Sequence, residues 1–362
     1  MLGEADAAAI GRAAQAVRPA ARSGPGTAER PFTGRTVVIQ PLPGIGDMAW
    51  HLAHLHALAE QAPSGRITVV AKPSSQAADL LGGEAWVEDI ITLRRRPRAG
   101  AGREGDGLLR LIGALRRRDF GTGVVLHHST TLACALQLAA IPNRFGYGFT
   151  HQRVCLNRPP FLPETCRPLD PVSKADAYIA ALGLPAGEPL PFLRPSASAR
   201  AEVAGRLAGQ GGPYVVLGVG SSEAYKQWGE AQFAQLCDAL QGAGWPLVVM
   251  LGGAAEAEMI GRLTRRSPVA FPAVGWRLGE VAALIQGAAY YVGNDTATLN
   301  LAAMAGSRAY GLFGATTPLR LGPWLRPVYP ADGPPRRTDG MERISVAAVL
   351  AAIVRDRGGL GH

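Results

Sequence analysis

The segment Pro41–Trp50 (PLPGIGDMAW) places a carboxylate beside two glycines. Gly44, Gly46 and Asp47 stand between a short β-branched run and an apolar stretch with helical spacing. An ionised aspartate here can accept a proton from a substrate hydroxyl, because the glycines allow close approach. The alternative is a first-turn acid that only stabilises the start of a helix. The spacing alone leaves both interpretations open.

The same segment satisfies the glycine pattern of a dinucleotide-binding turn, since Gly44, Gly46 and Ala49 have the required spacing. That pattern requires an acidic residue at the end of the second strand, where this chain has Ala71–Pro73. Asp47 would also compete with a pyrophosphate for the start of the helix. We therefore do not expect a dinucleotide site here.

A second segment, Gly218–Trp228 (GVGSSEAYKQW), combines a glycine turn with hydroxyl groups and an ammonium group. Ser221, Ser222 and Lys226 could hold a phosphate without a metal ion, because a positioned ammonium neutralises the negative charge. The segment is not a P-loop, since the GxxxxGK[ST] pattern is absent. A lysine that is merely exposed in a loop is the alternative.

A third segment, Val292–Gly306 (VGNDTATLNLAAMAG), clusters capping side chains ahead of an apolar helical stretch. Asn294, Asp295, Thr296 and Thr298 make this a strong helix-start signal. The free N–H groups of a helix start attract phosphates and sugar hydroxyls. Capping without any ligand is the alternative.

Basic side chains are concentrated in the first half of the chain. The runs Arg94–Arg98 (RRRPR) and Arg116–Arg118 are the densest, and His127 and His128 end a predicted strand. A charge run is commonly a solvated surface. Its restriction to one half of the chain nevertheless indicates that this half meets an anionic partner.

We expect no metal site. His51 and His54 could share one helix face, but we favour a place on the polar rim of a cleft. The cysteines, which form no CxxC pair, argue against a zinc ribbon or an iron–sulfur cluster and are expected as buried thiols in a reducing cytoplasm. They are Cys134, Cys155, Cys166 and Cys237.

The elements that position these groups alternate between short β-branched runs and longer helical stretches, which is typical of parallel α/β sheets. The predicted strands are Thr36–Gln40, Ile67–Ala71, Asp89–Leu93, Gly123–Leu126, Tyr214–Gly218, Leu247–Leu251, Val269–Phe271, Tyr290–Gly293 and Ala309–Phe313. The clearest helices are Met48–Ala59, Ala175–Leu182, Leu299–Ala305 and Val346–Arg355. We predict two Rossmann-like domains whose parallel sheets face each other across a cleft.

The predicted domain boundaries follow composition. We expect an N-terminal tail at 1–33, a first domain at 34–165, a proline-rich linker at 166–200, a second domain at 201–345, and a C-terminal helix and tail at 346–362. The tail carries Glu4 and Asp6 and lacks an apolar core, so a cleaved signal is not expected.

The composition of the whole chain limits the classes of function that it can have. The 362 residues are 47% hydrophobic and 18% charged, enough to bury a sizeable core. The formal net charge of +9 favours anionic partners. Aromatic residues make up only 6% and are not interleaved with the arginine runs, so we expect no nucleic-acid partner. No stretch of 18 apolar residues predicts a membrane span.

Taken together, the three segments resemble the heptosyltransferase family of inverting glycosyltransferases. The resemblance rests on a GxGD turn, then SSxxxKxW, then NDTxxxxLAAMAGxxxYGLFGxTxP, and extends over most of Arg35–Trp324. The order and spacing of the motifs make the combination specific.

The resemblance implies a GT-B fold in which the first domain binds the acceptor and the second binds ADP-heptose. Asp47 would be the base, and Ser221, Ser222 and Lys226 would hold the diphosphate, with Lys226 also stabilising the leaving group. Asp295, Thr296 and Ala297 would contact the donor sugar and phosphates, and either Glu256 or Glu258 would bind the ribose. The acceptor site would comprise Gly46, Arg94, Arg95, Arg96, Arg98 and His128.

The sequence departs from the family pattern at two donor-site positions. The usual DTG followed by His is replaced by Asp295, Thr296 and Ala297 followed by Asn300. Ala297 narrows the approach to the backbone, and Asn300 keeps hydrogen bonding while losing any cationic role. These changes affect the choice of donor more than the type of reaction.

The predicted function is therefore inverting, metal-independent glycosyl transfer without a cofactor, from a nucleotide sugar to an anionic glycolipid such as a lipopolysaccharide core. The expected place is the cytoplasm, with peripheral contact at the inner face of the membrane. One alternative is a sugar-nucleotide epimerase or hydrolase on a similar scaffold. The other is a non-enzymatic binding module for anionic lipid or nucleic acid.

Overall fold

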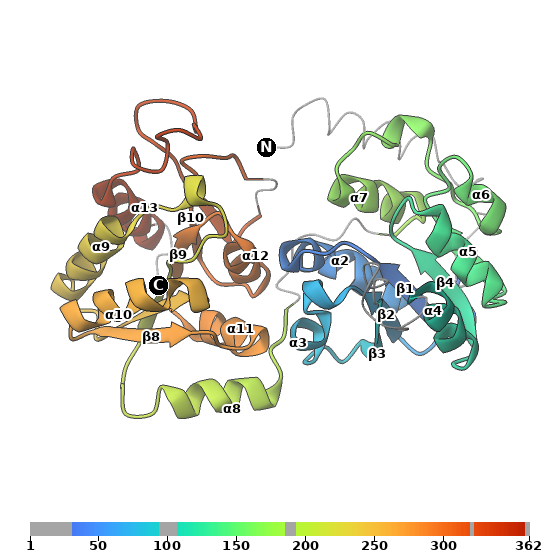
Figure 1. Cartoon of the computed structure of the whole chain (residues 1–362), viewed down its shortest axis with the longest axis horizontal. Coiled ribbons are helices and arrows are strands. Elements are labelled where there is room, and N and C mark those ends of the chain that lie inside the picture. Colours follow the sequence, from blue (N-terminus) through green and yellow to red (C-terminus); the bar gives the residue numbers. More distant parts are fainter. Residues whose placement is uncertain (1–30, 94–106, 185–192, 319–321, 359–362) are drawn as a thin grey trace, which may run out of the picture. The chain divides into compact units, whose positions relative to one another are not determined.

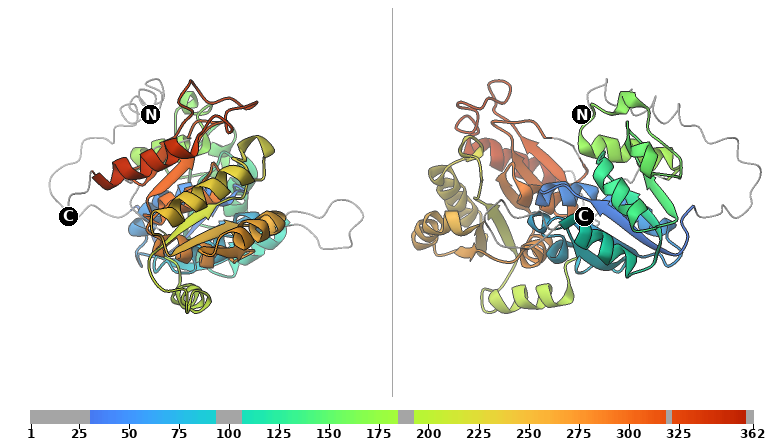
Figure 2. Two further views of the ribbon diagram at one scale, coloured as in Figure 1. Left: turned by 90° about the vertical axis from the view of Figure 1, so that its left-hand side faces the viewer. Right: turned by 45° about the vertical axis from the view of Figure 1, so that its right-hand side comes forward.

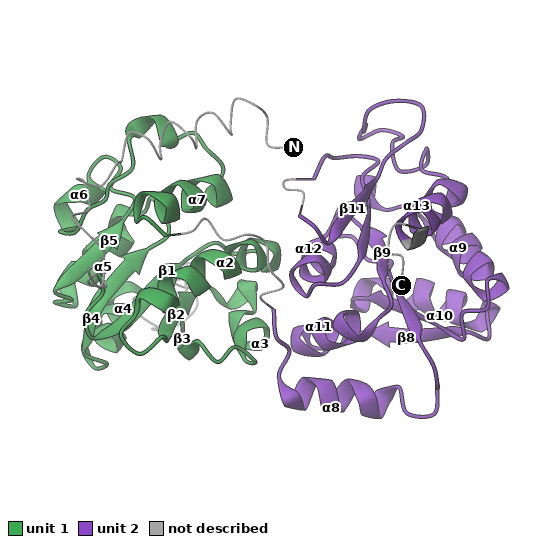
Figure 3. Cartoon of the chain, turned by 180° about the vertical axis from the view of Figure 1, so that it is seen from behind, with its two compact units in different colours: residues 1–190 green, residues 191–362 purple. Residues whose placement is uncertain are grey.

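The computed structural model describes residues 31–93, 107–184, 193–318 and 322–358. The chain divides into two compact units, Met1–Leu190 (unit 1) and Pro191–His362 (unit 2), which are coloured separately in Figure 3. Most of the expected N-terminal tail and the run Arg94–Arg98 lie outside the described residues.

Unit 1 is built on a five-stranded parallel sheet with the order β3-β2-β1-β4-β5 (Figure 1). The strands are β1 (Arg35–Gln40), β2 (Ile67–Ala71), β3 (Val87–Thr92), β4 (Phe120–Val125) and β5 (Asn143–Gly146). The helices are α2 (Ile45–Gln61), α3 (Ala77–Leu81), α4 (Gly107–Arg116), α5 (Thr130–Leu138), α6 (Gln152–Cys155) and α7 (Pro171–Ala181). Val37 and Ile39 of the central strand β1 pack in one buried cluster with apolar residues of α4 and α5. The β-branched run therefore forms the centre of this core.

Unit 2 is built on a six-stranded parallel sheet with the order β11-β10-β9-β6-β7-β8. The strands are β6 (Tyr214–Gly218), β7 (Leu247–Gly252), β8 (Ala270–Val274), β9 (Tyr291–Asn294), β10 (Ala309–Leu312) and β11 (Leu325–Val328). The helices are α8 (Ala197–Arg206), α9 (Glu230–Gly242), α10 (Ala257–Arg266), α11 (Leu278–Gly287), α12 (Ala297–Met304) and α13 (Val346–Gly358). Figure 2 shows α13 (red) beside α9 (yellow), and Val349 and Ile353 of α13 are buried in the core of this unit.

The predicted α/β class is confirmed, and every predicted strand overlaps an observed one. The sequence did not reveal β5 and β11, which are both four residues long and lie at sheet edges. Neither has the apolar run of a central parallel strand, because β5 begins with two polar residues and β11 contains Pro327.

The stretch 166–200, expected as a linker, contains helix α7 of unit 1 and the start of helix α8 of unit 2. α7 packs against α2 with Tyr178 and Ile179 fully buried, whereas α8 packs against α11. The division between the units falls after Leu190.

The expectation of four free thiols is wrong for two of them. Cys134 on α5 and Cys155 on α6 form a disulfide, because the two helices pack together and bring the Cα atoms to 5.1 Å. Cys166 and Cys237 are buried free thiols, as expected.

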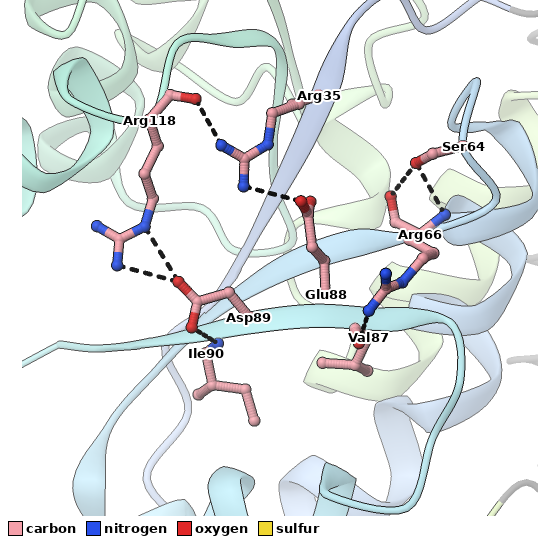
Figure 4. Close-up of polar contacts among 8 residues, drawn as sticks. All are labelled: Arg35, Ser64, Arg66, Val87, Glu88, Asp89, Ile90 and Arg118. Atoms are coloured by element: carbon pink, nitrogen blue, oxygen red, sulfur yellow. Dashed lines mark hydrogen bonds and ion pairs between the residues drawn. The ribbon is translucent and has the colours of Figure 1, made fainter.

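Ion pairs at the amino edge of the unit 1 sheet connect the edge strand β3 to β1 and to the residues before β4, across the intervening strand β2 (Figure 4). Arg35 at the start of β1 donates to Glu88 at 2.9 Å, and Arg118, just before β4, pairs with Asp89 at 3.0 Å. Both pairs are partly exposed, so each contributes about 0–1 kcal/mol. They leave the opposite, carboxyl edge of the sheet to the candidate site.

The close packing of Tyr291 against the backbone yields a stability prediction. A Cβ atom at Gly218 would overlap the Tyr291 hydroxyl, so Gly218→Ala should lower the free energy of unfolding by about 1–3 kcal/mol. Gly205 in α8 has open space around it, so Gly205→Ala should raise it by about 0.5–1 kcal/mol. Urea denaturation of both variants measures the contrast. A Gly218→Ala protein as stable as the wild type would contradict the packing described.

Candidate functional site

Asp47 lies in the first turn of α2, immediately after β1. Its Oδ2 accepts a hydrogen bond from the Gly44 N–H at 3.0 Å, and a Cβ at Gly44 would lie only 2.7 Å from that oxygen. The glycine therefore allows the carboxylate to fold back over the helix start. Asp47 is partly exposed, and Oδ1 makes no hydrogen bond within the described parts of the chain. One oxygen thus stabilises the helix, and the other is available to accept a proton.

Polar groups from three strands share the carboxyl edge of the unit 1 sheet. Gln40, the last residue of β1, pairs with Ala71 of β2, and Ile39 pairs with Val125 of β4. Lys72 and His127 follow those two strands, so they flank the β1–α2 turn that carries Asp47. The parallel register, rather than proximity in sequence, brings them to one edge.

His127 and His128 stack with ring centroids 4.2 Å apart. Burial, followed by the charges of His128, Lys72 and Lys174, lowers the pKa of His127 to about 4. Burial, then Lys174 and Arg167, also lowers the pKa of His128. The imidazoles are therefore neutral near pH 7 because of these surroundings.

We call these five side chains the basic cluster: Lys72, His127, His128, Arg167 and Lys174. No ion pair to Lys72, Arg167 or Lys174 is found within the described ranges, although the Asp170 carboxylate interacts electrostatically with Lys174. The cluster as a whole therefore favours an anionic ligand. Of these five residues, only the histidines stand out in the sequence. The other three come from segments that carry no common motif.

His51 and His54 do not lie on a polar rim, so that interpretation is wrong. Both are buried on α2, where His51 Nδ1 donates to the Asp47 carbonyl of the same helix at 2.6 Å. His54 Nε2 lies 2.7 Å from Asp176 Oδ1 of α7. His54 therefore links α2, the helix that carries Asp47, to α7.

In unit 2, Lys226 ends a short 3₁₀ turn after β6. Its Nζ lies 2.8 Å from Glu223 Oε2 and 3.3 Å from Asp295 Oδ2. Burial is the largest influence on the pKa of Lys226 and lowers it, but the contacts with Glu223 and Asp295 together outweigh burial and raise it. The ammonium is therefore charged, and it joins two of the segments that the sequence singled out.

The fully buried Asn294 fixes the loop that carries Lys226. Its Oδ1 accepts a hydrogen bond from the Trp228 N–H at 3.1 Å, and its Nδ2 donates to the carbonyl of Gly220 at 3.1 Å and to Gln227 at 2.6 Å. Both ends of the loop are thus tied to the carboxyl end of β9.

The start of α12 carries a chain of hydroxyl groups. Thr296 Oγ1 lies 2.9 Å from Thr298 Oγ1, which lies 2.9 Å from the hydroxyl of Tyr291. Burial raises the pKa of Tyr291 to about 12, so the phenol is neutral. Ala297 and Asn300 lie in the first turn of this helix and are partly exposed.

The remaining candidates of unit 2 differ in their hydrogen bonds and in their exposure. Ser221 Oγ donates to the carbonyl of Glu223 at 2.9 Å, whereas Ser222 is exposed. Glu256 Oε2 accepts from the Gly253 N–H at 2.9 Å and faces Gly220, at the carboxyl edge of the sheet. Glu258 instead pairs with Arg262 at 2.8 Å, and its side chain is 89% exposed.

The remaining expectations concern the acceptor-site candidates, a metal site and a membrane span. The candidates Arg94, Arg95, Arg96 and Arg98 lie outside the described residues, and Gly46 is the second residue of α2. Within the described ranges, no group of three or more His, Cys, Asp and Glu side chains could hold a metal ion. No helix in those ranges is both long and apolar enough to cross a membrane.

Two parallel α/β units with polar groups at the carboxyl edges of their sheets define a GT-B fold. Solved structures agree. The E. coli ADP-heptose lipopolysaccharide heptosyltransferase II has a TM-score of 0.68 at 20% identity, over 89% of this chain and 99% of that one. A family 9 glycosyltransferase from Veillonella parvula has a TM-score of 0.72 at 17% identity, over 90% and 97%. At these identities the similarity establishes the fold.

The sequence model of glycosyltransferase family 9 (heptosyltransferase) matches residues 108–328, and the chain belongs to this family. Lipopolysaccharide heptosyltransferase 3 of Escherichia coli K12 is 31% identical over 115 residues, 31% of this chain and 33% of that protein. Lipopolysaccharide heptosyltransferase 1 of Pseudomonas aeruginosa is 33% identical over 111 residues, 31% of each. The matched region spans about one third of these curated relatives.

The lowered pKa of His127 predicts a pH dependence of stability. The unfolded chain takes up this proton near pH 6.5, whereas the folded chain does so only near pH 4. The free energy of unfolding should therefore fall as the pH drops through this window. His127→Gln should reduce that loss, whereas His151→Gln, at an exposed site, should not. Urea denaturation at pH 7 and pH 4.5 measures the difference, and equal losses in wild type and His127→Gln would refute it.

Proposed function

We propose that the chain is an inverting glycosyltransferase that moves a sugar, in the first instance heptose from ADP-heptose, to a hydroxyl of a lipopolysaccharide core or related glycan. The observation that carries the proposal is Lys226, held as a charged ammonium beside Asp295 in a chain of family 9. Family membership indicates the class of reaction, and this cation can stabilise the negative charge of a leaving diphosphate.

The proposed reaction needs one proton acceptor and one anion-binding group. Asp47 takes the proton of the acceptor hydroxyl while its oxygen attacks the anomeric carbon. The bond from that carbon to the diphosphate breaks on the opposite face, and configuration inverts. Lys226 stabilises the negative charge that develops on the leaving diphosphate, so the chemistry requires no metal ion or cofactor.

On the donor side, Ser221 and Ser222 assist Lys226 at the diphosphate, and Glu256 binds the ribose hydroxyls. Asp295, Thr296, Ala297 and Asn300 contact the sugar and phosphates at the start of α12, where N–H groups are free for hydrogen bonding. The exposed, Arg262-paired position of Glu258 supports the choice of Glu256.

On the acceptor side, we propose an anionic glycolipid. The basic cluster and Gly46 lie at the same sheet edge as Asp47, and Arg94–Arg98 adds charge in the same unit. A lipid-anchored acceptor and a net charge of +9 also favour peripheral contact with the inner face of the cytoplasmic membrane.

Asp47→Asn tests the base. It removes the proton acceptor at almost constant shape, so transfer from ADP-heptose to a lipopolysaccharide core acceptor should fall by about 10²–10⁴-fold. ADP affinity, measured by calorimetry, should not change. Asp79→Asn, also in a first helical turn but exposed on α3, should keep wild-type activity.

Near-wild-type transfer by Asp47→Asn would refute the assignment. Incubation with the donor alone separates the reaction classes. Transfer predicts no turnover without an acceptor, whereas release of free sugar or formation of an epimer would establish the hydrolase or epimerase alternative.

Glu256→Gln and Glu258→Gln test the ribose site. Removal of a carboxylate that accepts hydrogen bonds from ligand hydroxyls should weaken ADP binding by about tenfold for Glu256→Gln. Glu258→Gln should leave it unchanged, since Glu258 pairs with Arg262 at an exposed position. Calorimetric titration with ADP gives both values. Equal weakening in the two variants would overturn the choice.

A further inference from the structure

Two carboxylates of the chain itself already compensate the positive charge of the Lys226 ammonium. Its two partners, Glu223 and Asp295, each bring one negative charge within 3.3 Å. Contact with Lys226 is the largest influence on Glu223 and lowers the pKa of its carboxyl, so the pair is fully ionised. A diphosphate that approaches Lys226 therefore meets carboxylates as well as a cation, and one of them must give way.

The two carboxylates are held very differently. Asp295 is 22% exposed and accepts a second hydrogen bond, from Thr316 Oγ1 at 2.7 Å, at the fixed junction of β9 and α12. The side chain of Glu223 is 45% exposed and belongs to the loop between β6 and α9. Glu223 is consequently the carboxylate that can move.

Glu223 also has partners that would hold it after such a movement. Its Oε1 accepts a hydrogen bond from the hydroxyl of Tyr225 at 2.7 Å. The guanidinium of Arg337 lies 4.8 Å from the centre of the Tyr225 ring and interacts electrostatically with Glu223. Arg337 is thus a second cation beside the same loop, and the sequence motifs did not include it.

We propose that Glu223 is an exchangeable counter-ion, displaced from Lys226 by the diphosphate of the nucleotide and then retained by Tyr225 and Arg337. The proposal rests on the function inferred above and adds a residue that sets how tightly that site binds the diphosphate. Because displacement costs an ion pair, a ligand must bring phosphate charge to bind at Lys226. Glu223 therefore weakens the binding of a nucleoside diphosphate at Lys226 and leaves the binding of an uncharged nucleoside unchanged.

Calorimetry on the full chain tests the proposal with Glu223→Gln. The amide keeps the size of the side chain and the hydrogen bond with Tyr225 but removes the competing charge. ADP should bind about tenfold more tightly than to the wild type. Adenosine, which has no phosphate to compete with Glu223, should bind with unchanged affinity.

Glu202→Gln is the matched control. Glu202 is an exposed glutamate of the same unit that pairs with Arg206 on α8, so its loss changes the net charge equally. ADP affinity should stay at the wild-type value. A tenfold gain in Glu202→Gln as well would show a general charge effect and overturn the proposal.

The remaining outcomes are equally decisive. Unchanged or weaker ADP binding by Glu223→Gln would overturn the counter-ion role while leaving the proposed function intact. Tighter binding of adenosine as well as ADP would overturn it too, because the effect would not depend on phosphate. Absence of ADP binding to both the wild type and the variant would overturn this inference and the proposed function together.

Discussion

The buried amide of Asn294 is the interaction on which the unit 2 site depends. The loop after β6 and the start of α12 are far apart in sequence, and each follows a different strand. The Asn294 side chain forms hydrogen bonds with the Trp228 N–H, the Gly220 carbonyl and Gln227, and so joins the loop to the strand that leads into α12. An amide suits this place because it donates and accepts at once, whereas a carboxylate could only accept. The contact between Lys226 and Asp295 follows from this connection.

Central strands could be predicted closely because burial on both faces demands a continuous apolar run. The bounds of β2 and β6 agree to the residue with the expectation. The edge strands β5 (NRFG) and β11 (LRPV) could not be predicted, since their extended conformation comes from pairing with β4 and β10 rather than from their own composition. The disulfide between Cys134 and Cys155 likewise depends on how α5 meets α6.

For the candidate site, the sequence alone could single out residues that stand beside a helix start or a glycine turn. Asp47, Lys226 and Asp295 belong to such segments, and their local geometry is set by a few neighbours. The basic cluster could not be predicted, because Lys72, Arg167 and the histidines come from distant segments that only the parallel register and tertiary packing bring together. Glu256 and Glu258 could not be separated, because the distinction depends on the turn in which α10 begins.

The outermost strands of both sheets have a consequence for self-association. A strand with free N–H and C=O groups can recruit another chain unless its length or composition prevents pairing. Here β5 and β11 are four residues long, β8 and β11 each contain a proline, and β3 carries charged side chains engaged in ion pairs. Edge-to-edge pairing between molecules is therefore disfavoured throughout the described sheets, and self-association is better served by the surfaces of helices and loops.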